Sequence, residues 1–145
     1  MVQHELMEKN ASAVTFPDCF PEGAPPEDAT PVNGEYFRIT NKRKPSKACF
    51  LTDYQKDPED VLTRQGLVKV CSYGISLQNS IEGVRETVGR FRNATMKRYI
   101  AKAKLVPDVG VIKQTFDEGF HHTLWIYSGV ELSPLFKCIE MVEPK

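Results

Sequence analysis

The sequence lacks any long run of apolar residues. No stretch approaches the roughly 18 consecutive apolar residues of a membrane-spanning helix, which excludes that class of protein. The first nine residues are polar and of mixed charge, so they resemble neither the basic nor the apolar region of a secretory signal peptide. We therefore expect a cytoplasmic protein.

Cysteine and histidine are scarce. The four cysteines lie far apart, with no C-x-x-C or Cys/His spacing that would bind zinc, so no metal is expected. We interpret Cys49 and Cys138, each set among apolar neighbours, as small buried thiols. Of the three histidines, His4 lies near the N-terminus, whereas His121 and His122 are adjacent.

Several well-known motifs are also missing. The sequence contains no G-x-G-x-x-G, no Walker loop, no G-x-S-x-G and no H-E-x-x-H. Dinucleotide folds, P-loop enzymes, hydrolases with a nucleophile elbow and zinc proteases therefore lack support from motifs.

The formal charge is zero overall, but the two parts of the chain differ. Residues 1–33 carry one lysine and six acidic residues, and the remainder carries 18 basic and 13 acidic residues. Five of the ten prolines fall within residues 17–31, which predicts an extended arm rather than packed structure. We thus expect a proline-rich acidic arm over residues 1–33 and a single domain over residues 34–145.

The rest of the chain predicts short strands with few helices. Aromatic and β-branched residues or alternating patterns predict strands at 35–40, 73–77, 99–105, 111–115, 119–127 and 135–142, with 99–105 and 111–115 forming a hairpin, and a short strand or strand-like turn at 48–52. One helix is expected over residues 58–64, stopped by Gly66, and a clearer one after Asn79, with an apolar stripe of Ile81, Val84, Val88 and Phe91. These elements indicate an α+β domain with a bent or split, mainly antiparallel sheet and one or two helices.

Residues 119–127 combine both adjacent histidines with the single tryptophan. Because successive side chains of a strand point to opposite faces, His121 shares a face with Thr123 and Trp125, and His122 faces the apolar side. Imidazole is the commonest general base, so His121 is the better candidate for a site residue. For His122 a structural role is favoured.

Two charged residues lie in strands where their charge needs a partner. Arg38 is flanked by Phe37 and Ile39, so its guanidinium must meet an anion, either a ligand or a carboxylate such as Glu140. Glu140 lies on the last strand, where either face would bury a charge, and a buried carboxylate is one route to a functional acid. The alternative for Glu140 is exposure at the end of the strand.

A third group consists of hydroxyl-bearing residues before loops: Thr52, Tyr73 and Ser76. Such residues contact ligands, although they are more often turn or cap residues.

Between residues 85 and 104 there are seven basic residues and one acidic residue, Glu86. We interpret that stretch as a solvated face, so nucleic acid is not the expected partner, and an RNA-contacting module using Tyr99 ranks below the alternatives.

The chain places residues 36–39 on a first strand, residues 50–52 on a second, residues 74–77 before a helix, and a carboxylate on a later strand. This order resembles that of the ADP-ribosyltransferase-like domains, including RES-type toxins. This resemblance implies that Arg38 contacts the phosphate or ribose of NAD. It also implies that Thr52 or Ser76 supplies a hydroxyl, and Glu131 or Glu140 the acid.

The leading hypothesis is a domain that binds or processes NAD or another nucleotide. Its expected catalytic residues are Arg38, His121 and Glu140, and its expected cofactor-binding residues are Thr52, Tyr73, Ser76 and Trp125. The alternative is a non-catalytic module that engages a protein partner through its acidic arm or its basic face. Whether the chain is an enzyme stays open at this point, and the two hypotheses differ in whether Arg38 and His121 share one pocket.

Overall fold

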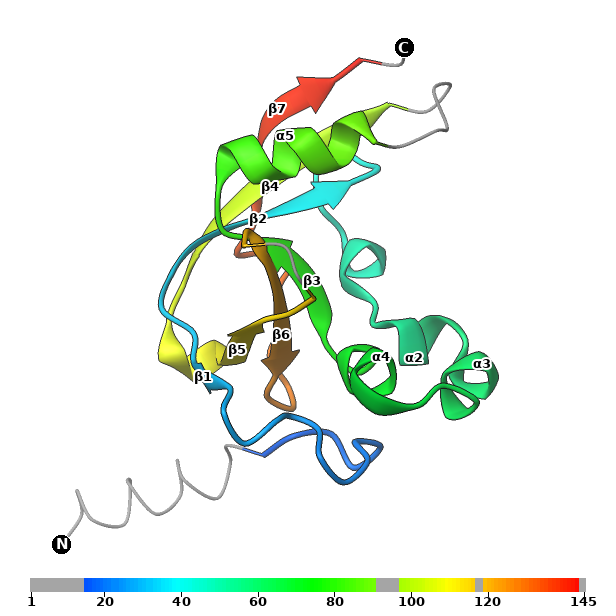
Figure 1. Ribbon diagram of the computed structural model, residues 1–145. Helices are drawn as coiled ribbons and strands as arrows, with labels where there is room; N and C mark the ends of the chain where they lie inside the picture. The colour runs from blue at the N-terminus through cyan, green and yellow to red at the C-terminus, as the bar shows by residue number, and fades with distance from the viewer. Residues whose placement is uncertain (1–14, 91–96, 117–118, 144–145) are drawn as a thin grey trace, which may run out of the picture.

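A single antiparallel sheet organises the computed structural model, which describes residues 15–90, 97–116 and 119–143 (Figure 1). Within these residues the sheet has seven strands in the order β1-β5-β6-β3-β2-β4-β7, and every neighbouring pair is antiparallel. The strands are β1 (Thr30–Pro31), β2 (Gly34–Thr40), β3 (Ile75–Gln78), β4 (Arg98–Leu105), β5 (Gly110–Gln114), β6 (His121–Ile126) and β7 (Lys137–Val142). The predicted α+β class with a mainly antiparallel sheet is confirmed.

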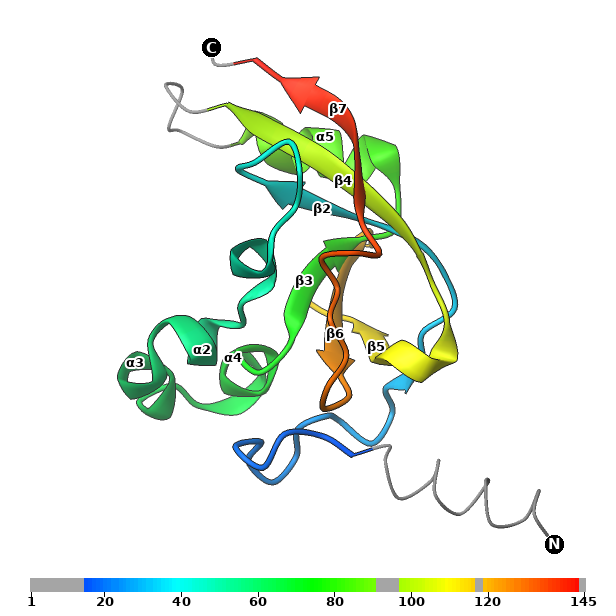
Figure 2. The same cartoon turned by 180° about the vertical axis from the view of Figure 1, so that it is seen from behind.

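The helices are short and most of them gather on one side of the sheet. The α-helices of the described residues are α2 (Asp53–Lys56), α3 (Pro58–Leu62), α4 (Gly66–Cys71) and α5 (Ile81–Gly89), and the 3-10 helices are η1 (Lys47–Phe50) and η2 (Pro107–Val109). Figures 1 and 2 both place α2, α3 and α4 together beyond β3, whereas α5 lies along β2 and β4. None of these helices is long and apolar enough to cross a membrane.

The sheet consists of two halves that meet at one residue pair. Strands β2 and β4 pair along seven residues, and β3 pairs with β6 along four, but β2 and β3 share only the pair Phe37 and Gln78. Beyond that pair the two strands separate. The gap between the halves is where a side chain from β2 can reach the backbone of β3.

Successive side chains of β2 point to opposite faces of the sheet and therefore lie in two different environments. Phe37 packs with Val84 and Ile100 beneath α5. Arg38 and Tyr36 point to the opposite face. Helix α5 itself begins at the cap residue Ser80, whose side chain accepts a hydrogen bond from the Gly83 amide. The predicted helix is therefore confirmed, with its cap one residue later than Asn79.

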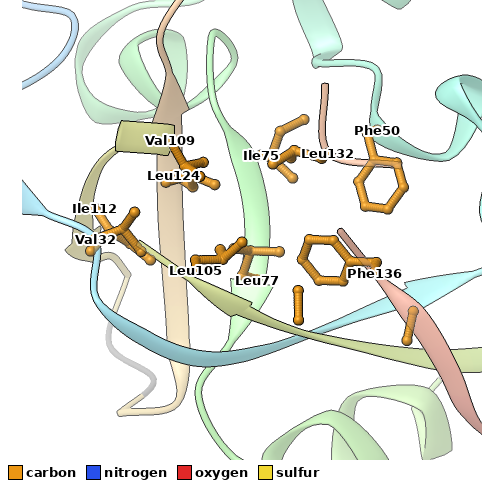
Figure 3. Close-up of a cluster of buried hydrophobic side chains, with 12 residues drawn as sticks. Val32, Phe50, Ile75, Leu77, Leu105, Val109, Ile112, Leu124, Leu132 and Phe136 are labelled. Atoms are coloured by element: carbon orange, nitrogen blue, oxygen red, sulfur yellow. The ribbon is translucent and has the colours of Figure 1, made fainter. Parts of the chain in front are cut away.

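The main core lies on the face opposite α5 (Figure 3). Leucines from three different strands, Leu77, Leu105 and Leu124, are fully buried there, and each contributes about 1.5–3 kcal/mol of transfer free energy. The rings of Phe50 and Phe136 lie 5.0 Å apart at the other end of this core. The predicted division of residues 99–105 into a lysine face and an apolar face is confirmed, because Ala101, Ala103 and Leu105 are buried.

The predicted hairpin between residues 99–105 and 111–115 is wrong. Strand β4 pairs with β2 and β7, and β5 pairs with β1 and β6. Helix η2 intervenes between β4 and β5, and the amide of Tyr127 donates to the Val109 carbonyl, which directs the chain to the other half of the sheet.

Two local predictions around α2 to α4 are also wrong. Residues 48–52 are not a strand, because η1 and the cap of α2 occupy this stretch. Gly66 has a φ of 65° and begins α4 rather than ending structure. The prediction of a helix near residues 58–64 is closer, since α3 covers Pro58–Leu62 with Asp57 as its cap.

The proline-rich segment is packed, contrary to the prediction of a free arm. Phe16 and Phe20 pack against a buried cluster with Tyr73 and Trp125, and β1 adds to the sheet edge beside β5. The aromatic residues next to the prolines make packing contacts that the high proline content of this segment did not indicate. His4, Phe91 and Arg92 lie outside the described residues.

Candidate functional site

A pocket of about 280 Å³ lies where the two halves of the sheet separate. Its lining comes from β2, β3, β6 and the short helices α2 and α4. The residues that give it chemical character are Arg38, Asp53, Lys56, Ser76, Phe116 and His121. Arg38 and His121, the two residues on which the enzyme hypothesis depends, therefore line the same pocket.

Arg38 bridges the gap between the sheet halves. Its Nη1 donates to the carbonyl of Ser76 at 2.7 Å, and its Nε donates to the carbonyl of Cys49 at 2.9 Å. Both acceptors are neutral, and Nη2 has no hydrogen-bond acceptor among the described residues. The alternative of a salt bridge between Arg38 and Glu140 is wrong, because Glu140 pairs with Arg85.

The charge of Arg38 is only partly compensated. Burial lowers the pKa of Arg38 to about 10, and the neighbouring Cys49 and Asp53 oppose this decrease. The guanidinium is still protonated at neutral pH. An anion at Nη2 would both satisfy the free donor and balance the charge.

His121 is held by hydroxyl groups on both sides of its ring. Its Nε2 lies 2.6 Å from Ser76 Oγ, and its Nδ1 lies 2.9 Å from Thr115 Oγ1. Thr115 Oγ1 in turn lies 2.8 Å from Thr123 Oγ1, which donates to Cys71 Sγ at 3.5 Å. A fixed imidazole next to an exposed serine hydroxyl can take a proton from it or from a ligand.

The predicted faces of β6 are confirmed. His121 and Thr123 point toward the pocket, and Trp125 shares their face but lies deeper, in the cluster under α4. His122 is on the other side, where its ring contacts Tyr36 with centroids 5.8 Å apart.

Further cations come from the short helices. Lys56 of α2 is exposed and forms no ion pair among the described residues. Arg64 pairs with Asp53 at 2.9 Å and with Asp60 at 2.7 Å. Of the charged Lys, Arg, Asp and Glu side chains that line the pocket within the described residues, three are cationic and Asp53 alone is anionic.

Two of the expected cofactor-binding residues are core residues. Trp125 is fully buried and its Nε1 donates to the Val70 carbonyl at 3.0 Å. Tyr73 is 2% exposed, and its ring stacks on Tyr54 with centroids 4.8 Å apart. Neither Tyr73 nor Trp125 lines the pocket.

Glu140 is likewise absent from the pocket lining. Its carboxylate accepts two hydrogen bonds from Arg85 of α5, the longer of 3.0 Å, and this pairing lowers the pKa of Glu140. Glu131 lines other surface hollows. Among the described residues, the carboxylate that does line this pocket is that of Asp53.

Thr52 caps α2 instead of facing the pocket. Its Oγ1 accepts from the Gln55 amide at 3.1 Å, and the Gln55 side chain accepts from the Thr52 amide at 2.8 Å. This reciprocal pair is a capping box.

Replacing Thr52 with alanine is expected to lower the free energy of unfolding by about 1 kcal/mol, because one amide of the first turn of α2 loses its acceptor. Urea denaturation measures this change. Thr87→Ala is the matched control, since the Thr87 hydroxyl donates to a carbonyl within α5 and caps nothing. An unchanged unfolding free energy in Thr52→Ala would contradict the capping role.

The sequence analysis did not identify Asp53, Lys56 and Phe116 as pocket residues, or Thr115 as the partner of His121. The spacing of Thr52 and Gln55 is a capping-box signal that would have placed Asp53 and Lys56 on a helix. Phe116 adopts a φ of 58°, and no pattern in the sequence predicts this conformation.

Among the described residues, no group of three or more His, Cys, Asp and Glu side chains could hold a metal ion. Comparison of the chain with protein-family models, with curated proteins and with solved structures finds no match.

Proposed function

We propose that the pocket at the junction of the two sheet halves binds and processes a nucleotide, with NAD as the leading candidate. The observation that carries this proposal is the presence of Arg38, Ser76 and His121 around one pocket, where Nη2 of Arg38 has no acceptor within residues 15–90, 97–116 and 119–143. The NAD candidate itself comes from the resemblance to ADP-ribosyltransferase-like domains.

Each part of a nucleotide has a counterpart in this pocket. Arg38 Nη2 and Lys56 supply charge-assisted donors for phosphate oxygens. Ser76 and His121 offer hydrogen bonds to the ribose hydroxyls, and His121 acts as the base for a nucleophile that attacks the ribose carbon. The carboxylate of Asp53 stabilises the positive charge that develops on the ribose as its bond to the base breaks.

Isothermal titration with NAD, ADP-ribose and AMP tests this function directly. We expect saturable binding of at least one of these ligands, and thermal unfolding should shift upward, by about 2.7 kcal/mol of stability at 100 times the dissociation constant. Release of free nicotinamide from NAD would establish the reaction. Absence of binding by all three ligands would refute the nucleotide proposal.

The affinity for ADP-ribose is expected to depend on pH through Arg38. An anion binds the protonated guanidinium, so affinity should be complete at about pH 7 to 9 and should fall as the pH rises through about 10. Titrations in the Lys56→Gln variant assign the decline to Arg38, because the exposed lysine of the pocket is then removed. Affinity that persists well above pH 10 would contradict this role of Arg38.

Protein interaction is a second candidate function, and an exposed apolar patch favours it. Leu62 is 61% exposed, Leu67 42% and Val68 51%, all on or at the ends of neighbouring helices α3 and α4. A patch of this kind is typical of a binding surface. Serine at Leu62 and Leu67, which do not line the pocket, should then abolish association with a partner without changing the titration of ADP-ribose.

A further inference from the structure

We infer that Ser76 is an activated nucleophile, with His121 as its general base, and that the pocket hydrolyses esters that carry an anionic group. This inference extends beyond nucleotide binding and does not depend on it. It rests on the hydrogen bonds that fix the protonation of the His121 ring and on the exposure of the Ser76 side chain.

A chain of hydroxyl groups determines which nitrogen of His121 carries the proton. Thr123 donates its hydroxyl hydrogen to Cys71 Sγ, so Thr123 Oγ1 accepts from Thr115. Thr115 has then used its only hydrogen, and its Oγ1 must accept from Nδ1 of His121. The neutral ring is therefore protonated at Nδ1 and unprotonated at Nε2.

Cys71 Sγ is the acceptor at the end of this chain of hydroxyl groups. Burial raises the pKa of the Cys71 thiol, so the thiol stays neutral.

The unprotonated Nε2 faces Ser76 Oγ at 2.6 Å, which makes Ser76 the donor of this hydrogen bond. A base in direct contact with a hydroxyl, itself oriented by a third group, is the arrangement that activates serine nucleophiles on unrelated folds. Here the orienting group is the hydroxyl of Thr115 rather than a carboxylate.

Positive charge lies next to the nucleophile. Arg38 Nη1 is bound to the backbone carbonyl of Ser76 itself, and Nη2 of the same guanidinium has no acceptor among the described residues. A donor in this position can stabilise the negative oxygen of a tetrahedral intermediate. Lys56, also in the pocket lining, can bind an anionic group elsewhere on the substrate.

The reaction needs only the ester and water. Ser76 Oγ forms a bond to the carbonyl carbon while its proton moves to Nε2 of His121. The bond from that carbon to the alkoxy oxygen breaks, and the alcohol leaves with the proton from His121. A water molecule then gives its proton to Nε2 and attacks the acyl carbon. The bond from that carbon to Ser76 Oγ breaks as Oγ takes the proton back from His121, which releases the carboxylic acid and restores Ser76.

A fluorophosphonate probe tests the nucleophile in the full chain, with mass spectrometry locating the adduct. We expect labelling at Ser76, none at this position in Ser76→Ala, and a labelling rate lowered by at least about 100-fold in His121→Gln. Ser128→Ala, which removes another exposed serine, should leave labelling unchanged. Absence of labelling, an adduct elsewhere, or an unchanged rate in His121→Gln would overturn the inference.

Thr115 is a positioning residue in this mechanism. Its replacement tests whether it acts by orienting the His121 ring or only by stabilising the fold. Thr115→Ser keeps the hydroxyl and should keep the labelling rate, whereas Thr115→Val should lower the rate by about tenfold and displace its pH profile. Equal rates in Thr115→Val and Thr115→Ser would contradict the proposed protonation of the ring.

Substrate class and nucleotide binding can be examined in the same assay. Hydrolysis of p-nitrophenyl hemisuccinate, which is anionic, should show a lower KM than that of p-nitrophenyl acetate, and equal KM values would exclude the anionic preference. Excess ADP-ribose should protect Ser76 from the probe if the nucleotide occupies this pocket. Labelling of Ser76 without protection would count against the nucleotide and leave the nucleophile in place.

Discussion

Replacing Arg38 with glutamine is expected to weaken ADP-ribose binding by about 10- to 100-fold. A hydrogen bond to a charged group contributes about 1.5–3 kcal/mol, and each 1.4 kcal/mol corresponds to a factor of ten in affinity. Glutamine removes the charge and the free Nη2 donor of Arg38. Isothermal titration of the purified variant measures the loss.

Two further variants test whether this loss of ADP-ribose affinity is specific to the Arg38 guanidinium. Arg38→Lys keeps the charge but cannot hold the carbonyls of Cys49 and Ser76 while also reaching a ligand, so we expect an intermediate affinity. Arg85→Gln is the matched control, because Arg85 pairs with Glu140 away from the pocket. Equal affinities in Arg38→Gln and Arg85→Gln would exclude Arg38 from the binding site.

The position of Arg38 depends on the incomplete pairing of β2 and β3. Because these strands share only the pair Phe37 and Gln78, the Ser76 carbonyl accepts from a guanidinium instead of a neighbouring strand. The same separation exposes the Ser76 side chain beside His121. A break in the sheet thereby provides both an anion-binding group and a hydroxyl at one point.

Local patterns were sufficient to predict some parts of this arrangement. The period-2 alternation of β6 correctly assigned His121 to the face of Thr123 and His122 to the opposite face. The alternation in β4 likewise identified its buried face. In each case the alternating pattern that supports the prediction extends over only a few residues of the chain.

Pairing between distant segments could not be predicted in this way. Strand β5 follows β4 closely in sequence, yet it pairs with β6, since η2 and the contact between Tyr127 and Val109 redirect the chain. Thr115 becomes the partner of His121 only through that pairing. The hydroxyls of Thr52 and Tyr73 looked equivalent to Ser76 in sequence, but one caps a helix and the other is buried.

Trp125→Ala is expected to destabilise the fold by about 3–5 kcal/mol. Removal of a buried tryptophan loses its transfer free energy and leaves a cavity. Trp125 is fully buried, and its Nε1 also satisfies the Val70 carbonyl at the end of α4. Guanidinium denaturation monitored by circular dichroism measures this change, which would remove most of the stability of a domain whose unfolding free energy is about 5 kcal/mol.

Trp125→Phe separates the structural role of this residue from a role in binding. Phenylalanine keeps most of the apolar volume, and the Val70 carbonyl still accepts from the Tyr73 amide at 3.3 Å, so the loss of the indole hydrogen bond should cost only about 0.5–1.5 kcal/mol. Because Trp125 does not line the pocket, the affinity of the folded Phe variant for ADP-ribose should equal that of the unaltered protein. A variant that keeps its stability but loses affinity would instead place the indole in contact with the ligand.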